Sequence, residues 1–188
     1  MALADVTDWI GDFGRPGTIW YAKRLSANDT LATKAHQAGP YIQKEFLFLV
    51  FPSLNRPDAK NPDHRFDLYI DSHADHQKVR AVWYNNKAWG GTRNETRLTN
   101  FGGQQSALLD PASTGALSVF VFVLNSEGAA SECHVWVCQD ETQEDLFEER
   151  LGPVEPGSPV TWTPGTPPIT DLFGVGAQLP DTCHLNEQ

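Results

Sequence analysis

The hydrophobic residues of this chain concentrate in short runs that are rich in β-branched and aromatic side chains. This composition is typical of β-strands. We expect one strand at Leu117 to Leu124 and another at Cys133 to Cys138, and the polar segment Asn125 to Ser131 between them predicts a hairpin. Two further strands are expected at Phe66 to Ile70 and at Val79 to Tyr84.

Signals for helices are fewer. Glu45 to Phe51 is apolar almost throughout, and periodicity does not distinguish a short strand from a buried helix there. Thr142 to Arg150 predicts a short helix, because Thr142 can cap its start and acidic residues suit its first turn. Many short strands with few helices predict a mainly β barrel or sandwich.

The composition of the chain changes at residue 152. Seven of the thirteen prolines fall between residues 153 and 180, and such a segment does not pair easily inside a sheet. We therefore expect one domain over residues 1–151, followed by a linker or loosely packed tail over residues 152–188 that leads to another domain. Alternatively, part of this segment wraps around the barrel. Three of its apolar residues could make that contact: Trp162, Leu172 and Phe173.

Charge is distributed unevenly along the chain. The net charge of −10 at first argues against a nucleic-acid ligand, because affinity for phosphate comes from clustered lysines and arginines. However, thirteen of the fourteen Lys and Arg residues lie between Arg15 and Arg97, together with only eight acids. The rest of the chain holds one base, Arg150, and sixteen acids. The basic half of the chain can therefore bind a polyanion such as a nucleic acid. An acidic surface on the opposite side would orient the protein by repelling phosphate.

The three cysteines, Cys133, Cys138 and Cys183, suit reduced thiols better than a disulfide framework, because no secretion signal precedes them. No stretch approaches the length of an apolar membrane span. We expect a soluble protein of the prokaryotic cytoplasm that does not bind a membrane. Cys133 and Cys138 stand at opposite ends of one predicted strand, so their side chains should point to opposite faces and cannot share a zinc ion.

No arrangement of residues predicts an active site or a metal centre. Asp58 to Lys60 matches half of a common nuclease motif, but no Pro-Asp pair precedes it, so we interpret it as a solvated loop. His76 to Lys78 resembles the core of another nuclease signature, which also needs an Asp a few residues later. His73 and His76, with aspartates beside them, have no partner pair at the spacing of a zinc site. We expect no catalytic residues and no metal or other cofactor in this domain.

Two segments are more polar and basic than ordinary loops need to be. The first arm, Lys23 to Tyr41, contains a single acid, and the second arm, Lys87 to Arg97, contains a Gly90-Gly91 hinge. Both carry side chains that read base edges in the major groove, where Arg binds guanine, Asn and Gln bind adenine, and Glu accepts from cytosine. The alternative is that both are flexible surface loops. Core packing is expected, rather than base stacking, for three aromatic residues: Trp83, Tyr84 and Trp89.

Both arms resemble one known family. The shared text includes KRLSANDT (Lys23 to Thr30), HQ-G-YI (His36 to Ile42), TRNE-R-T (Thr92 to Thr99) and DP--TGAL (Asp110 to Leu117). Over roughly residues 15–157, the chain is similar to the N-terminal effector domain of EcoRII-type restriction endonucleases.

The resemblance implies a B3-like DNA-binding pseudobarrel, an open barrel of about seven strands with short helices. In this family two arms grip the major groove of double-stranded DNA at 5′-CCWGG. The domain binds an effector copy of the site and does no chemistry, while a covalently linked nuclease domain, for which Mg²⁺ is expected, cuts the DNA.

The residues expected to contact DNA, by matched position and by composition, are Lys23, Arg24, Ser26, Asn28, Asp29, Thr30, Lys34, His36, Gln37, Tyr41, Lys87, Trp89, Thr92, Arg93, Asn94, Glu95 and Arg97. Some positions depart from the family pattern. Gly91 and Thr96 stand where lysines are expected, and Lys34-Ala35 replaces two glycines. These departures affect the expected phosphate contacts more than the base contacts.

Two other functions remain open. A module for modified bases or single strands would accept an extruded base in an aromatic pocket. A protein-interaction β-domain would use the acidic half of the chain to dock a basic partner, and it would show no salt-dependent binding to DNA.

Overall fold

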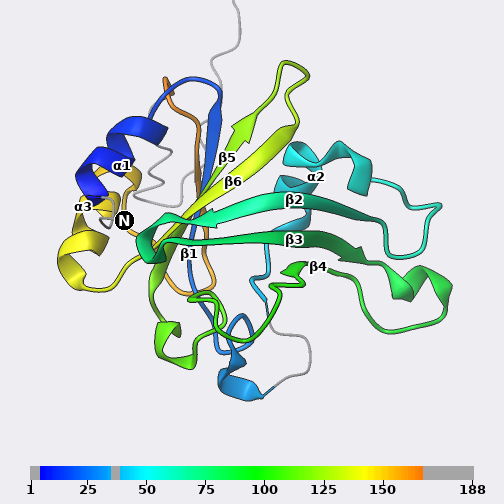
Figure 1. Cartoon of the computed structure of the whole chain (residues 1–188). Coiled ribbons are helices and arrows are strands. Elements are labelled where there is room, and N and C mark those ends of the chain that lie inside the picture. Colours follow the sequence, from blue (N-terminus) through cyan, green and yellow to red (C-terminus); the bar gives the residue numbers. More distant parts are fainter. Residues whose placement is uncertain (1–4, 35–38, 167–188) are drawn as a thin grey trace, which may run out of the picture.

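The centre of the molecule is a single curled sheet of seven strands (Figure 1), seen in a computed structural model that describes residues 5–34 and 39–166. The spatial order is β4-β3-β2-β6-β5-β1-β7, and all neighbours are antiparallel except β2 and β6. The strands are β1 (Thr18–Arg24), β2 (Asp63–Ile70), β3 (Asp75–Tyr84), β4 (Glu95–Thr99), β5 (Leu117–Leu124), β6 (Ala130–Val137) and β7 (Val160–Trp162). The expected mainly β architecture, an open barrel of about seven strands, is confirmed.

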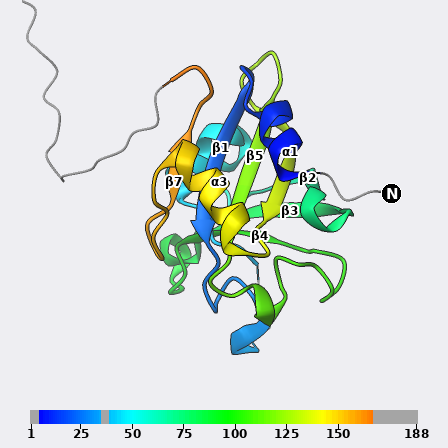
Figure 2. The ribbon, with the colours of Figure 1, turned by 90° about the vertical axis from the view of Figure 1, so that its left-hand side faces the viewer.

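Short helices cover both faces of the sheet. The α-helices of the described segments are α1 (Val6–Phe13), α2 (Lys44–Val50) and α3 (Glu141–Leu151). The helices α1 and α3 lie together on one face, and α2 lies on the other (Figures 1 and 2). The sheet therefore has a hydrophobic layer on each side.

The alternation of side chains along the strands supplies both layers. In β1, Trp20 packs in the layer under α1 and α3, whereas Tyr21 packs in the layer under α2. The central strand β5 is buried on both faces, so that Val121 joins the first layer and Phe122 the second. This double burial explains why β5 is a continuous apolar run rather than an alternating one.

Several local predictions are confirmed and others need correction. The bounds of β5 are those expected from its apolar run. The ambiguous segment Glu45 to Phe51 forms α2, with Phe46, Leu47 and Val50 buried. The cap of α3 is not Thr142 but Asp140, whose side chain accepts a hydrogen bond from the backbone N–H of Gln143. An Asp caps as well as a Thr, and here it stands where the extended chain enters the helix.

Part of the proline-rich segment lies against the sheet. Strand β7 pairs with β1, and Trp162 is buried with its ring 4.9 Å from that of Trp20. Since β7 is a short edge strand, the prolines around it remove no hydrogen bond from the sheet interior. Leu172 and Phe173 lie outside the described residues, as does Cys183.

Cys133 and Cys138 are buried in opposite layers of the sheet, as expected from their spacing. Burial raises the pKa of both thiols, which makes them poor nucleophiles. In the part of the chain that the structure describes, no helix is long and apolar enough to cross a membrane.

Candidate nucleic-acid interface

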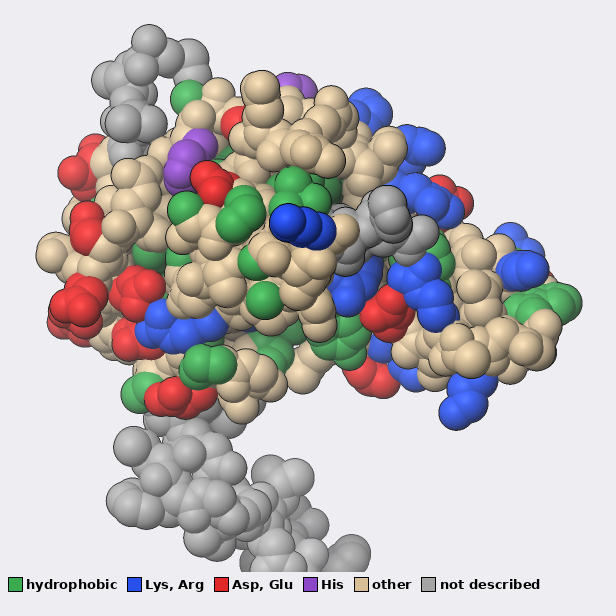
Figure 3. All heavy atoms as spheres, turned by 90° about the horizontal axis from the view of Figure 1, so that it is seen from below, with side chains coloured by type: hydrophobic (Ala, Val, Ile, Leu, Met, Phe, Trp, Pro, Cys, Tyr) green, Lys and Arg blue, Asp and Glu red, His purple; other side chains and the backbone are tan. Residues whose placement is uncertain are grey.

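The two arms meet on one face of the barrel. Tyr41 at the end of the first arm forms an isolated antiparallel bridge with Arg97 at the end of the second. A hollow of about 460 Å³ is lined by residues of both arms and by residues 157–159. Figure 3 shows this face from below. Lys and Arg side chains gather from its centre toward the end that carries the second arm, and acids gather at the opposite end, near α1 and α3.

Asp29 organises the first arm from inside. Its carboxylate is buried and accepts hydrogen bonds from the backbone N–H groups of Ser26 and Tyr41, each at 2.8 Å. Its carbonyl oxygen accepts a third hydrogen bond from the N–H of Gly39 at 2.8 Å. Hydrogen bonds to a carboxylate are stronger than neutral ones. The buried Asp29 therefore holds the two ends of the arm together.

Lys23 lies beneath the first arm. Its Nζ atom is 2.7 Å from Asp29 Oδ2 and donates to the carbonyl oxygen of Tyr41 at 2.9 Å, and its side chain is only 11% exposed. Burial lowers the pKa of Lys23, and the attraction of Asp29 offsets only part of that effect. Lys23 thus neutralises Asp29 and secures Tyr41 instead of extending toward solvent.

Arg97 joins the two arms. Its guanidinium donates to the carbonyl oxygens of Asn28 and Gly39, at 3.1 and 2.8 Å, and lies 3.4 Å from Glu95 Oε2. The backbones approach so closely here that a Cβ at Gly39 would collide with the carbonyl oxygen of Leu98. A residue with a side chain at position 39 would therefore push the arms apart.

The second arm forms a closed turn. The N–H of Lys87 donates to the carbonyl oxygen of Arg93 at 2.9 Å, and the N–H of Gly91 donates to that of Asn86 at 2.8 Å. Gly90 adopts a left-handed conformation with φ of +85°, which a residue without a Cβ reaches at no steric cost. The expected Gly-Gly hinge is therefore a fixed turn that carries residues 86–89 outward.

Arg93 is held in a defined orientation at the base of this turn. Its guanidinium lies 3.9 Å from the centre of the Tyr84 ring, and its Nε donates to Glu95 Oε1 at 3.0 Å. Burial disfavours the ionised form of Glu95, but the hydrogen bond from Arg93 and the charges of Arg97 and Arg93 outweigh it, so the pKa of Glu95 is lowered. Glu95 therefore orients the guanidinium of Arg93 in this structure.

Arg24 and Thr30 face the body of the protein. The guanidinium of Arg24 binds Glu144 at 2.8 Å and Glu148 at 3.1 Å, both on α3. The hydroxyls of Thr30 and Thr114 are hydrogen-bonded at 2.9 Å. Both residues therefore support the first arm from below.

The candidate residues fall into groups by exposure. Five of them make the contacts within the protein that are described above: Lys23, Arg24, Asp29, Thr30 and Arg97. The exposed ones are Ser26, Asn28, Lys34, Tyr41, Lys87, Trp89, Thr92 and Asn94. Arg93 and Glu95 are half-buried. His36 and Gln37 lie outside the described residues.

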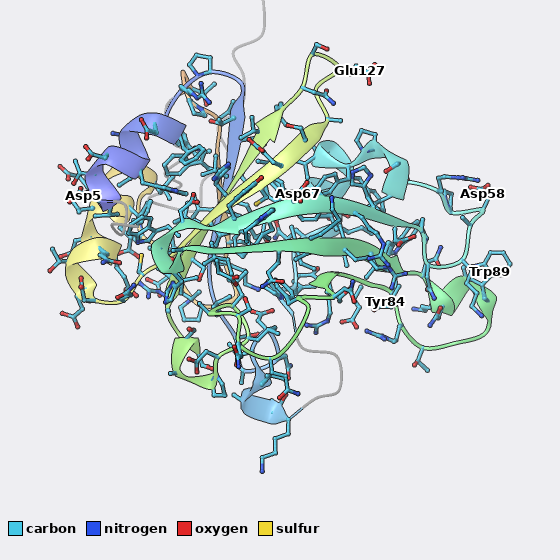
Figure 4. The ribbon with its side chains drawn as sticks, viewed as in Figure 1. Asp5, Asp58, Asp67, Tyr84, Trp89 and Glu127 are labelled. Carbon is cyan, nitrogen blue, oxygen red and sulfur yellow. The ribbon has the colours of Figure 1, made fainter. Side chains whose placement is uncertain are left out.

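The expectation that the nearby aromatic residues pack in the core is wrong for Trp89, which is 51% exposed near the tip of the second arm. Figure 4 shows it projecting from this end of the molecule, beyond Tyr84. Trp83 is half-buried, packs against Phe48 at 5.1 Å and donates from Nε1 to Asn94 Oδ1 at 2.8 Å. The sequence pattern did not distinguish the exposed Trp89 from the half-buried Trp83, because the turn that exposes Trp89 depends on hydrogen bonds around Gly90.

Some residues at the hollow were not predicted. Tyr21 and Gln43 line it, and the hydroxyl of Tyr21 accepts a hydrogen bond from the N–H of Gln43 at 3.1 Å. Ser158 and Pro159 line it as well. Gln43 lies just past the first arm and could have been included with it. Residues 157–159 carry no signal in the sequence, because only the pairing of β7 with β1 brings them here.

Within residues 5–34 and 39–166, no group of three or more His, Cys, Asp or Glu residues could hold a metal ion. Asp71, one of the aspartates beside His73 and His76, accepts a hydrogen bond from Trp9 Nε1 at 2.6 Å and lies 2.8 Å from His134 Nδ1. His76 instead contacts Asp67, at 3.2 Å.

The chain is similar to known restriction endonucleases. The solved B3 domain of the UbaLAI restriction endonuclease, with cognate DNA, aligns over 85% of this chain and 98% of its own, at 14% identity and a TM-score of 0.48. The type II restriction enzyme EcoRII of Escherichia coli is 34% identical over 167 residues, which is 88% of this chain and 41% of the enzyme. The chain thus spans less than half the length of that curated relative. The model of the family "Restriction endonuclease EcoRII, N-terminal" matches residues 14–166. The chain therefore belongs to the family of EcoRII N-terminal domains.

Proposed function

We propose that this chain binds double-stranded DNA in a sequence-specific manner, at 5′-CCWGG, by placing its two arms in the major groove. It acts as the effector or target-recognition domain of a type II restriction endonuclease whose nuclease domain lies in another part of the full-length protein. The named relative is such an enzyme, and this chain corresponds to 41% of its length.

The observation that carries the proposal is the fixed orientation of Arg93. A guanidinium binds guanine O6 and N7 through two parallel hydrogen bonds, and its plane must be set before the contact forms. Tyr84 lies under the face of the Arg93 guanidinium, and Glu95 Oε1 accepts from its Nε and Nη2 atoms. This arrangement lowers the conformational entropy that Arg93 would lose on binding a base.

The exposed polar residues of the first arm complement Arg93. Ser26, Asn28 and Tyr41 lie on the outer side of a turn that Asp29 and Lys23 fix from below. Asn can bind adenine through two hydrogen bonds, and Ser can contact either a base edge or a phosphate. Binding by this domain requires no metal ion, whereas cleavage by the linked nuclease domain requires Mg²⁺.

Gel-shift titrations at fixed salt test the proposal with a CCWGG duplex, its single-base variants and a random duplex. Because a good bidentate contact discriminates by about 1–3 kcal/mol, Arg93→Ala should lose roughly ten- to a hundred-fold in affinity for the cognate duplex and much less for the random one. Arg65→Ala is the control, since Arg65 is exposed on β2, outside both arms.

Equal losses on both duplexes would make Arg93 a backbone contact and would contradict base readout by the second arm. Tighter binding to the single strand than to the duplex would favour a module for unpaired or modified bases. A complete absence of salt-dependent binding would favour a protein-interaction domain.

A further inference from the structure

A third loop lies against the second arm. Asn85, buried at the base of that arm, accepts a hydrogen bond from the N–H of Asn61 at 2.8 Å through its side-chain oxygen. Its side-chain nitrogen donates to the carbonyl oxygen of Ala59 at 2.6 Å. One amide therefore bonds two residues of the loop 55–62 with both of its polar atoms, and this loop and the second arm form one unit.

The outer side of this unit is basic and aromatic. Arg56 and Lys60 are exposed on the loop, and Lys87 and Trp89 are exposed on the second arm. Asp58 is the acid of the loop and pairs with Arg56 at 3.1 Å. Figure 4 shows Asp58 and Trp89 at the same end of the molecule, and Figure 3 shows Lys and Arg side chains at that end of the face that carries the arms.

The unit lies beyond the residues that would read the site. Arg97 contacts the first arm, and Arg93 lies four residues earlier, two residues before β4 begins at Glu95. Four residues span at most about 13 Å, at ~3.3 Å each in a fully extended chain. That distance corresponds to about four base-pair steps at 3.4 Å. The stretch from the first arm to Arg93 is thus long enough to cover a five-base-pair site. Trp89 lies beyond the Arg93 end of that stretch.

We propose that the loop 55–62 and the tip of the second arm together bind duplex DNA that flanks the recognition site. The inference rests on the proposed function and extends it. Lys60 and Lys87 bind phosphates, and Trp89 packs its ring against the sugar–phosphate backbone, where it excludes water from those contacts. Phosphate contacts carry no sequence information, so this surface adds affinity and fixes the register of the arms on the duplex.

Two cognate duplexes test this inference with the full chain. The short one ends just outside the site, and the long one adds about ten base pairs, one helical turn, on each side. The salt dependence of binding should be steeper for the long duplex. For the long duplex, Lys60→Ala should lower the slope of log affinity against log salt concentration by about 0.9, the amount for one phosphate. The slope for the short duplex should stay unchanged. Arg65→Ala, on the exposed side of β2, should change neither slope.

A second variant keeps the test independent of charge. Trp89→Ala should weaken binding to the long duplex severalfold more than binding to the short one. The inference would be overturned if Lys60→Ala changed the salt slope equally for both duplexes, or changed it for neither, in a chain that still binds the cognate site. Failure of the unmodified chain to bind either duplex would instead contradict the proposed function itself.

Discussion

At the scale of single residues, the same polar residue types serve two purposes at this site. Lys23 and Asp29 have the composition of a base-reading arm, yet they are buried against each other and hold the backbone. Asn28 and Ser26 beside them are exposed. Sequence alone could identify the arm but not this division, because burial depends on how the arm closes on Arg97, far along the chain.

Glu95 offers a test of the contacts around Arg93 through pH. Its pKa in the folded protein lies below the ordinary value of 4.5 because of Arg93 and Arg97. A group with a depressed folded pKa stabilises the protein above its unfolded pKa, and the effect is lost as pH falls through the folded pKa. Glu95→Gln should therefore unfold at a lower temperature than the unmodified chain at neutral pH, and the gap should shrink below pH 4.5.

Thermal unfolding followed by circular dichroism across this pH range measures that gap. Glu127→Gln is the matched control, because Glu127 is exposed in the turn between β5 and β6, remote from Arg93. A gap between Glu95→Gln and the unmodified chain that stays constant to strongly acidic pH would show that the charge of Glu95 does not hold the guanidinium.

At the scale of elements, composition predicted strands with a clear apolar run, such as β5, and missed short or polar stretches that pair with partners elsewhere in the chain. Strand β5 was predicted to the residue, since a continuous apolar run is buried on both faces. Strand β7 has three residues among prolines, and it exists because β1 offers it an edge. The polar start of β3, Asp75 to Lys78, was missed because its side chains are exposed or half-buried beside β2.

The contact between β1 and α3 gives a prediction at this scale. Arg24 binds Glu144 and Glu148 of α3 and donates to the carbonyl oxygen of Val154 at 2.7 Å. Arg24→Met keeps the apolar stem and removes these bonds. Because hydrogen bonds to charged groups contribute about 1.5–3 kcal/mol each, less where solvent screens them, the melting temperature should fall by several degrees.

Differential scanning calorimetry measures this loss, with Arg65→Met as the control for removing an exposed arginine from a strand. The ratio of cognate to random-duplex affinity should stay unchanged at a temperature where Arg24→Met is folded. If Arg24→Met instead keeps the stability of the unmodified chain while its ratio of cognate to random-duplex affinity falls, Arg24 contacts DNA directly.

At the scale of the whole molecule, the net charge of −10 hides two ends of opposite sign. On the face with the arms, Lys and Arg gather from the centre toward the second arm, and acids gather at the end near α1 and α3 (Figure 3). The sequence predicted this asymmetry, because thirteen of the fourteen bases lie between Arg15 and Arg97. It did not predict that the basic loop 55–62 lies against the second arm, since the buried amide of Asn85 makes that contact through two hydrogen bonds that leave no pattern in the sequence.

This asymmetry predicts that the acidic end improves specificity by repelling DNA that approaches in the wrong orientation. Asp12, Asp145 and Glu149 are exposed acids of α1 and α3 outside the first turns of those helices, so their neutralisation removes no favourable interaction with a helix N-terminus. The combined variant Asp12→Asn, Asp145→Asn and Glu149→Gln should bind random duplex more tightly at low salt. It should gain proportionally less on the cognate duplex, where the arms already fix the orientation.

The effect should vanish at salt concentrations that reduce the screening length to a few ångströms. Titrations of both duplexes at low and high salt measure it, and equal gains on both would show that the acids lower affinity generally without orienting the molecule.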